Sequence, residues 1–324
     1  MPMSIKVQGI IGAGISDEQL AFIREMGIEY VNLNIGLEHC DYGSLCEIKK
    51  KTEKHGIIVS DIACVPLQKN AAIDLGLPER DAEIQKFNEF VKASSQAGIP
   101  IVSIAWQPNG ILRTGWGVGE HTRGGISMYA DMEEIVARPY ANGRAFGEQE
   151  IWDNFSYFME RTIPVCEKAG VRMALHPNDP PVSCLVGVHS LIHNTECYRK
   201  AFALVDNSPA LAMKMCVGCW LEGGDAFGNL MEDIKEFCEK DQIVCVHLRN
   251  VSATIPYFEE TLAEDGYAEM YAIVKQFVRC SYNGLMSIDH AFRGYPTTGG
   301  RIGSFAYPTG YLKGMIYAAE QELA

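Results

Sequence analysis

Four side chains of types that commonly bind metal ions follow short apolar runs in the second half of the chain: His176, Cys216, His247 and Asp289. Two imidazoles, one thiol and one carboxylate suit a divalent transition metal such as Mn, Fe, Co, Zn or Ni. Zinc is the default by affinity, whereas mixed ligation with open positions also suits Mn or Fe(II). Each residue alone has an ordinary structural explanation, such as a small buried thiol or a helix cap. Their recurrence at equivalent positions predicts one shared metal site.

Further polar residues lie directly beside these ligands. His290 follows Asp289, and an imidazole next to a metal ligand can act as a general acid or base. Asn178 and Asp179 follow His176 in the hexapeptide His-Pro-Asn-Asp-Pro-Pro, whose prolines stiffen the loop. We therefore expect these polar groups to point in fixed directions near the metal.

Arg249 and Asn250 follow His247 in the same way. A guanidinium can bind a substrate carboxylate through two parallel hydrogen bonds. It can equally form an ion pair with a residue at a neighbouring strand end, so the sequence leaves both interpretations of Arg249 open.

The segment Cys216-Val217-Gly218-Cys219 is a C-x-x-C pair. A zinc ribbon needs a second pair with this spacing, and the chain contains none. A thioredoxin-like redox pair belongs near the start of a helix in a much smaller fold. We therefore predict a structural role for Cys219 and keep Cys216 as the metal ligand.

Eight apolar, β-branched runs alternate with helical patterns and would position these residues. The predicted strands are Ile5–Ile11, Tyr30–Ile35, Gly56–Val65, Pro100–Trp106, Val171–His176, Leu211–Cys216, Ile243–Leu248 and Leu285–Asp289. Their nearly continuous apolar character is typical of strands buried on both faces of a parallel sheet. Helical periodicity between them predicts helices at Asp17–Met26, Asp81–Gln96, Trp152–Lys168, Met231–Glu239 and Gly310–Glu322.

Eight strand–helix pairs predict a (β/α)8 TIM barrel, a single α/β domain over residues 1–324. A doubly wound open sheet competes with it, because strand order is invisible in a sequence. On a barrel, the carboxyl ends of the strands meet at one face, which is where the four ligands would converge. The long connection at about 107–149, rich in Gly, Arg and aromatic residues, is expected to lie over that face.

Composition excludes several classes of partner. The chain has 28 Lys and Arg against 41 Asp and Glu, a net charge of −13, which disfavours nucleic-acid binding. No stretch approaches the roughly 18 apolar residues of a membrane span, and we find no secretory signal. Eleven cysteines without such a signal indicate a reducing cytoplasm and mostly free thiols.

The segment Glu150–Pro181 resembles the mannonate dehydratases of the hexuronate pathway, in which a helix leads into a strand that ends in a near-identical His-Pro-Asp-Asp-Pro-Pro. The resemblance continues in five shorter motifs, which are Arg-Thr-Gly-Trp at Arg113–Trp116, Lys-Met-Cys-Val-Gly at Lys214–Gly218, Val-His-Leu-Arg-Asn-Val at Val246–Val251, Tyr-Phe-Glu-Glu at Tyr257–Glu260 and Asp289-His290. It is concentrated from residue 150 onward.

This resemblance implies a xylose-isomerase-like TIM barrel that binds Mn²⁺ or Fe²⁺ through His176, Cys216, His247 and Asp289. It implies removal of water from D-mannonate to give 2-keto-3-deoxy-D-gluconate, with His290 as the catalytic histidine, and a homo-oligomeric assembly. A Lewis acid beside the sugar-acid carboxylate would make the C2 proton more acidic. A base would take that proton, and an acid would protonate the departing C3 hydroxyl. The residues expected to contact this small-molecule substrate are Arg113, Trp116, Asn178, Asp179, Arg249, Asn250 and Glu260.

The chain departs from the family pattern mainly around the acid and the base. Asn178 stands where the family has Asp, and Phe258–Glu260 lacks the histidine of the family's Phe-His-Glu. The C-terminal segment is shorter, and a gapless match places Gly300 at the position of the family's catalytic tyrosine. Tyr295 and Tyr307 are the candidates to replace it.

Three functions follow from these observations. The first, which the residues favour, is a mannonate dehydratase with a rearranged C-terminal loop. The second is an isomerase, epimerase or other lyase that uses the same metal centre on a related sugar, because these reactions also begin with proton abstraction. The third is a barrel that only binds ligands. A tyrosine hydroxyl across the metal from His290 would favour dehydration over the second.

Overall fold

Eight parallel strands close into a barrel at the centre of the molecule. The computed structural model describes residues 4–290, 292–293 and 300–324. The strands follow one another around the barrel in the order β1-β14-β11-β10-β7-β4-β3-β2. Their bounds are β1 (Lys6–Gly12), β2 (Tyr30–Ile35), β3 (Ile58–Cys64), β4 (Ile101–Ala105), β7 (Arg172–His176), β10 (Leu211–Cys216), β11 (Ile243–Leu248) and β14 (Leu285–Ile288). The TIM barrel prediction is confirmed with all eight strands, and the open sheet is wrong because the sheet closes on itself.

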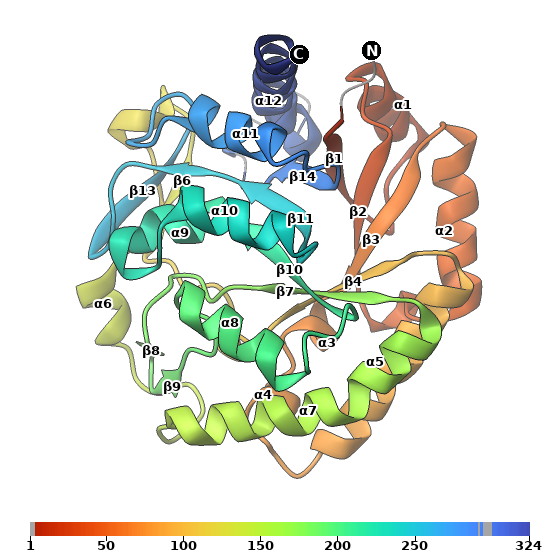
Figure 1. Cartoon of the computed structure of the whole chain (residues 1–324), viewed down its shortest axis with the longest axis vertical. Coiled ribbons are helices and arrows are strands. Elements are labelled where there is room, and N and C mark those ends of the chain that lie inside the picture. Colours follow the sequence, from red (N-terminus) through yellow and green to blue (C-terminus); the bar gives the residue numbers. More distant parts are fainter. Residues whose placement is uncertain (1–3, 291, 294–299) are drawn as a thin grey trace.

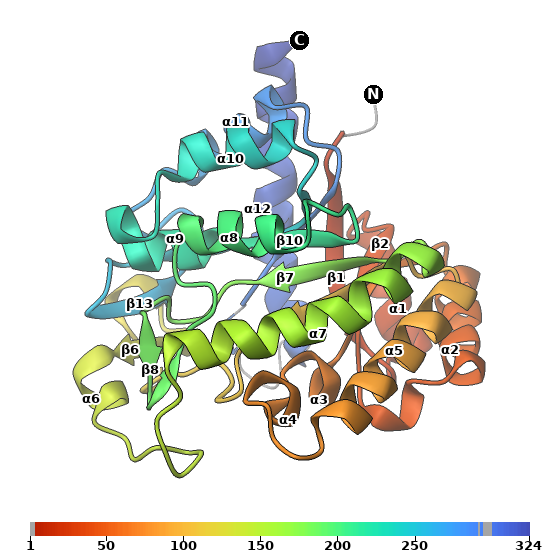
Figure 2. The same cartoon turned by 60° about the horizontal axis from the view of Figure 1, so that its bottom comes forward.

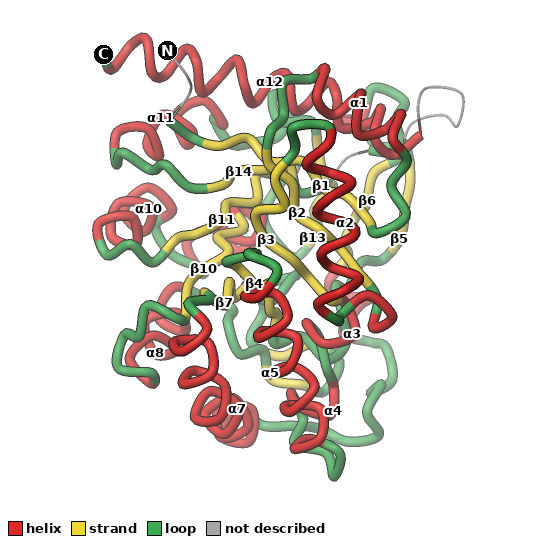
Figure 3. The backbone as a smooth tube through the Cα atoms, turned by 90° about the vertical axis from the view of Figure 1, so that its right-hand side faces the viewer, coloured by secondary structure: helices red, strands yellow, loops and turns green. Residues whose placement is uncertain are grey.

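The long helices lie outside the strands, as Figures 1 and 3 show. They are α1 (Asp17–Glu25), α2 (Tyr42–Lys54), α5 (Arg80–Gln96), α7 (Glu148–Ala169), α8 (Thr195–Leu204), α10 (Leu230–Glu239), α11 (Met270–Arg279) and α12 (Gly300–Leu323). Side chains satisfy the first backbone amides of several: Ser16 accepts from the Gln19 amide, and Asn194 and Asn229 do the same for α8 and α10. Among the described helices, none combines the length and apolar character of a bilayer span.

The last helix begins earlier than predicted. Its predicted start was Gly310, but α12 already begins at Gly300 and contains Pro308. Glycine, proline and threonine between residues 300 and 310 are typical of a loop, and an internal proline removes one backbone hydrogen bond of a helix. The helix continues through it, and its later turns bury Leu312 and Ile316. Tertiary packing of this kind outweighs local helix propensity.

A buried polar network occupies part of the barrel interior. Lys214 Nζ on β10 lies 3.1 Å from Asp61 Oδ2 on β3, and both side chains are almost fully excluded from solvent. Asn32 donates to the same carboxylate, as does Gln8, and Gln8 also donates to Ser60 Oγ at 2.8 Å. The charged pair is therefore surrounded by hydrogen-bonding partners, which a buried ion pair needs to be tolerated.

Additional elements extend the connections at the carboxyl end of the barrel. The stretch 107–149 forms β5 (Gly115–Gly117), η2 (Glu120–Thr122), β6 (Ser127–Asp131) and α6 (Met132–Val136), and β6 pairs antiparallel with β13 (Tyr257–Thr261). These strands and β12 (Asn250–Val251) make a four-stranded sheet in the order β12-β13-β6-β5. Figure 2 shows β6, β13 and α6 on one side of the molecule. The remaining short elements are η1 (Leu37–His39), α3 (Val65–Gln68), α4 (Ala71–Asp74), β8 (Cys184–Leu185), β9 (Val188–His189), α9 (Val217–Gly223) and η3 (Gly224–Ala226).

Candidate active site

The four predicted metal ligands converge at the carboxyl end of the barrel. His176 and Cys216 end β7 and β10, His247 is the next-to-last residue of β11, and Asp289 follows β14. Ligand atoms of His176, Cys216 and His247 all lie within 4.8 Å of one another. Asp289 joins them, with Oδ2 at 3.6 Å from Cys216 Sγ and Oδ1 at 3.1 Å from His247 Nδ1. The structure therefore brings the predicted ligand set into one cluster.

The protonation states of this cluster suit a bound cation. Burial and the neighbouring His247 lower the pKa of His176 to about 3, and burial also lowers the pKa of His247. Burial alone would raise the pKa of Asp289, but the charge of His290 and the close contact with His247 hold it well below its usual range. Neutral imidazoles and an ionised carboxylate are the forms that bind metal.

One nitrogen in the cluster also lacks a hydrogen bond. His247 Nδ1 is shielded from solvent and lies close to Asp289 Oδ1, but the two atoms are not aligned for a hydrogen bond. Among the described residues, this nitrogen has no hydrogen-bond partner. A buried ring nitrogen normally finds a partner. The unsatisfied nitrogen and the donor set together fit a divalent metal.

His290 forms a close pair with Glu260. Its Nδ1 lies 2.9 Å from both Glu260 oxygens, and its Nε2 lies 3.6 Å from Asp289 Oδ1. Burial disfavours the imidazolium, but Asp289 and Glu260 raise the pKa of His290. Burial likewise opposes ionisation of Glu260, yet His290 and the nearby arginines lower its pKa to about 2. The carboxylate thus fixes the Nδ1 side of the ring and leaves Nε2 facing the cluster.

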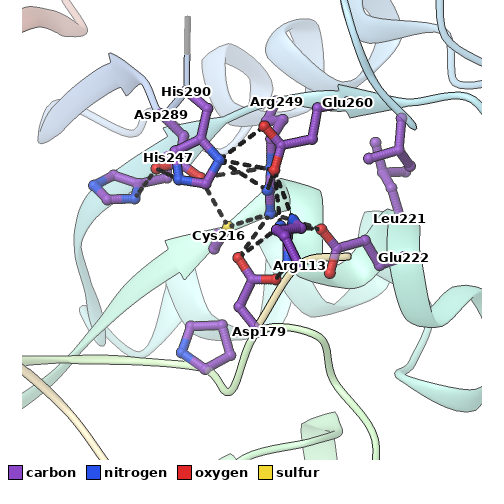
Figure 4. A network of polar contacts seen from close by, with 12 residues as sticks. Arg113, Asp179, Cys216, Leu221, Glu222, His247, Arg249, Glu260, Asp289 and His290 are labelled. Carbon is purple, nitrogen blue, oxygen red and sulfur yellow. Dashed lines mark hydrogen bonds and ion pairs between the residues drawn. The ribbon is translucent and has the colours of Figure 1, made fainter. Parts of the chain in front are cut away.

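Two buried arginines hold three carboxylates around this pair (Figure 4). Arg113 donates to Asp179 Oδ1 at 2.5 Å and through Nη2 to Glu260 Oε1 at 2.8 Å. Arg249 Nη1 donates to the same Glu260 oxygen at 2.6 Å. Glu222 Oε1 lies 3.2 Å from Arg113 Nη2 and 2.8 Å from Arg249 Nη2. Both guanidinium charges are therefore neutralised within the protein, and the ion-pair interpretation of Arg249 describes the observed contacts.

Glu222 is a site residue that the sequence analysis missed. Its side chain is fully buried in α9, and among the described residues its Oε2 has no hydrogen-bond partner. Burial and the neighbouring Asp179 raise the pKa of Glu222 well above its usual range. Its place directly after the apolar stretch from Cys216 to Leu221 was a weak signal in the sequence, because a carboxylate beside so many buried positions needs a partner.

Several residues that were predicted to contact substrate instead make their polar contacts with nearby loops, away from the cluster of proposed metal ligands. The Asn178 side chain donates to Trp106 O at 3.0 Å and accepts from the Ile192 amide at 2.9 Å. The Asn250 side chain donates to two backbone carbonyls, at 2.8 and 2.9 Å. Trp116 is 42% exposed, and the Arg293 guanidinium lies 3.6 Å from the centre of its ring.

The structure describes only one of the two candidate tyrosines. Tyr295 lies outside the described residues. Tyr307 lines a cavity of about 230 Å³ that also reaches Arg249 and His290. Its side chain is mostly exposed, and its hydroxyl donates to Glu264 Oε1 at 2.5 Å. Tyr307 therefore shares this cavity with His290, while its hydroxyl is engaged by the half-buried Glu264 carboxylate.

Comparisons with known proteins agree with this geometry. The family model described as D-mannonate dehydratase (UxuA) matches residues 127–321, more than half of the chain. A mannonate dehydratase of Streptococcus suis is 28% identical over 276 residues, covering 77% of this chain and 74% of that protein. Mannonate dehydratase 2 of Halalkalibacterium halodurans is 27% identical over 272 residues, covering 75% of this chain and 76% of that protein.

Solved structures share the fold. The crystal structure of mannonate dehydratase from Streptococcus suis serotype 2 superposes with a TM-score of 0.86 at 24% identity, covering 99% of this chain and 96% of that one. A xylose isomerase domain protein from Planctomyces limnophilus gives a TM-score of 0.66 at 11% identity, covering 99% and 100% of the two chains. These likenesses confirm the xylose-isomerase-like barrel. Together with the family match over residues 127–321, they confirm the resemblance found in the sequence: the chain belongs to the D-mannonate dehydratase (UxuA) family.

Proposed function

We propose that this chain is a metal-dependent dehydratase that converts D-mannonate to 2-keto-3-deoxy-D-gluconate and water. The observation that carries the proposal is the His290–Glu260 pair, with a contact of 2.9 Å, beside the cluster of His176, Cys216, His247 and Asp289. Family membership and the names of the similar proteins support a sugar-acid hydro-lyase.

The cofactor that we propose is Mn²⁺ or Fe²⁺, held by His176, Cys216, His247 and Asp289. A single thiol among harder donors suits these ions as well as zinc. When bound, such a cation supplies Lewis acidity that makes the proton next to the substrate carboxylate easier to remove.

His290 is the residue that we assign to proton transfer. Glu260 engages Nδ1, so Nε2 is the atom able to take the C2 proton. A carboxylate that fixes one ring nitrogen also fixes the ring's orientation and tautomer. Tyr307 could protonate the departing C3 hydroxyl only after its own hydroxyl leaves Glu264.

Arg113 and Arg249 keep Asp179, Glu222 and Glu260 in place, and their charges are already balanced. We therefore infer that they shape the site and set its field, and that the substrate carboxylate depends mainly on the metal. Asp179 and Glu260 already match the two guanidinium charges, which leaves little net attraction for another anion.

The test is turnover of D-mannonate by Mn²⁺-reconstituted protein, with formation of the keto-deoxy sugar acid as the readout. Protein stripped with EDTA and metal-loaded His290→Asn are the controls, and both should be inactive. Absence of product from the metal-loaded wild type would reject the dehydratase. A panel of related sugars assayed for isomerisation and epimerisation would then follow.

We also expect one domain over residues 1–324 that assembles into a homo-oligomer, works in the cytoplasm and has no nucleic-acid partner. The eleven free cysteines and the net charge of −13 support the compartment and the exclusion of nucleic acid. Light scattering coupled to size-exclusion chromatography would test the assembly.

A further inference from the structure

Two cysteines form a thiol pair at the carboxyl ends of β2 and β3, and neither contributes to the proposed metal site. Cys64 is the last residue of β3 and lies beside Ile35, the last residue of β2. The chain then forms η1, whose C-cap residue is Cys40. This turn places Cys40 Sγ 3.1 Å from Cys64 Sγ. The sulfur atoms are roughly 1 Å farther apart than in a disulfide bond of about 2.05 Å, so a small side-chain movement would join them.

The two thiols have different surroundings. Cys64 is buried, whereas Cys40 is half-buried and its Sγ also lies 3.6 Å from the Gly36 carbonyl oxygen. The hydrogen bond from Cys40 lowers the pKa of Cys64, and the Leu67 backbone amide lowers it further. The same hydrogen bond, together with burial, raises the pKa of Cys40. One member of the pair is thus favoured as the thiolate, and the other keeps its proton.

We propose that Cys40 and Cys64 form a site of reversible oxidation, at which hydrogen peroxide converts the two thiols into a disulfide. The Cys64 thiolate attacks one peroxide oxygen, the O–O bond breaks, hydroxide leaves and Cys64 becomes a sulfenic acid. The Cys40 sulfur then attacks the Cys64 sulfur. The S–S bond forms, the S–O bond breaks and the second oxygen leaves as water, after transfer of the Cys40 proton. Two thiols and one peroxide give one disulfide and two waters.

Peroxide suits this site better than a bulky oxidant. It is close to water in size, so only a small opening beside the half-buried Cys40 is needed for it to reach the buried Cys64. The 3.1 Å separation places the resolving thiol next to the oxidised sulfur, which favours the disulfide over further oxidation. Because Cys40 lies in the connection after β2 and Cys64 ends the adjacent strand β3, the disulfide would tie this connection to the end of β3, at the face where the proposed metal ligands gather.

A second pair of neighbouring cysteines lacks the lowered pKa that distinguishes Cys64. Cys238 and Cys280 also interact, but burial raises the pKa of Cys238 to about 12 and raises that of Cys280. Neither is favoured as a thiolate, so we expect peroxide to oxidise this pair more slowly.

The experiment uses the full-length, metal-loaded protein treated with increasing hydrogen peroxide. Free thiols are then alkylated, and peptides are analysed by mass spectrometry without reduction. The expected product is a Cys40–Cys64 cross-linked peptide about 2 Da lighter than the two thiol peptides together, which dithiothreitol restores. Cys184→Ser, a substitution of an exposed cysteine, should leave the cross-link unchanged.

Two variants test the order of events. Cys40→Ser should accumulate sulfenic acid at Cys64, which dimedone traps, whereas Cys64→Ser should leave Cys40 as a thiol. The proposal is overturned if both cysteines are alkylated at peroxide concentrations that already oxidise Cys184. The wild-type protein alone decides that point, even if a variant does not fold. The readout is peptide mass, so it is independent of whether the protein dehydrates D-mannonate.

Discussion

Replacing Gly218 by alanine would test whether stability and turnover depend on the position of the Arg249 guanidinium. A Cβ atom on Gly218 would lie 2.3 Å from Arg249 Nε and 2.8 Å from Cζ. Ordinary contact needs about 3.5 Å, so the guanidinium would have to retreat by roughly 1 Å. A retreat of this size away from Glu260 and Glu222 would lengthen its contacts with them, now 2.6 and 2.8 Å, beyond hydrogen-bond length. Gly218, in α9, therefore leaves room for the Arg249 guanidinium.

The expected loss of stability follows from the burial of Arg249. Arg249 is almost fully excluded from solvent, so water cannot replace a lost partner. One hydrogen bond between charged groups contributes about 1.5–3 kcal/mol, and we expect Gly218→Ala to lower the free energy of unfolding by that amount. A displacement of roughly 1 Å near reacting groups can reduce kcat/KM on the order of 10²-fold. Urea unfolding and D-mannonate turnover measure the two effects.

The matched control is Gly314→Ala on the exposed side of α12. A Cβ there meets no atom within 4 Å, so alanine should raise the free energy of unfolding by about 0.5–1 kcal/mol. If Gly218→Ala kept wild-type stability and turnover, the guanidinium would not be held where we infer, and the positioning argument would fail.

Four further outcomes are expected. Asp61→Asn leaves Lys214 charged and unpaired inside the barrel, and should lower the free energy of unfolding by about 3–5 kcal/mol in urea titrations. Metal removal with EDTA should lower the thermal midpoint and abolish turnover, and Mn²⁺ should restore both. His290→Asn should retain the metal in elemental analysis while turnover falls by roughly 10²–10⁴-fold. Hydrogen bonds from Arg199 lower the pKa of Glu236 to about 2, so its ionised form stabilises the fold above about pH 4 and this contribution disappears as the pH falls towards 2. The acid limb of the stability profile should be shallower in Glu236→Gln.

The barrel and its ligand cluster were predictable because both depend on local patterns. Strands buried on two faces appear as continuous apolar runs, and His176 and Cys216 stand where such runs end. The contact of Glu260 with His290 was not predictable, because it depends on β13 pairing with β6 across a long stretch of sequence. Glu222 was missed because an acidic residue after an apolar stretch looks like an ordinary surface position. Its role appears only when two arginines converge on it.

The site is built from two parts of the fold, the barrel strands and the four-stranded sheet beside them, and this has a consequence for refolding. The proposed metal ligands require only that neighbouring barrel strands associate. The Arg113–Glu260 contact instead joins residues 147 positions apart, and Glu260 is held by the four-stranded sheet β12-β13-β6-β5. Contacts between distant residues form slowly, because loop-closure entropy opposes them. Metal affinity and turnover should therefore recover with separate time courses after dilution from denaturant, with metal affinity returning first. A chain with a closed barrel and an unformed β6–β13 pairing would carry its metal without carrying out the reaction.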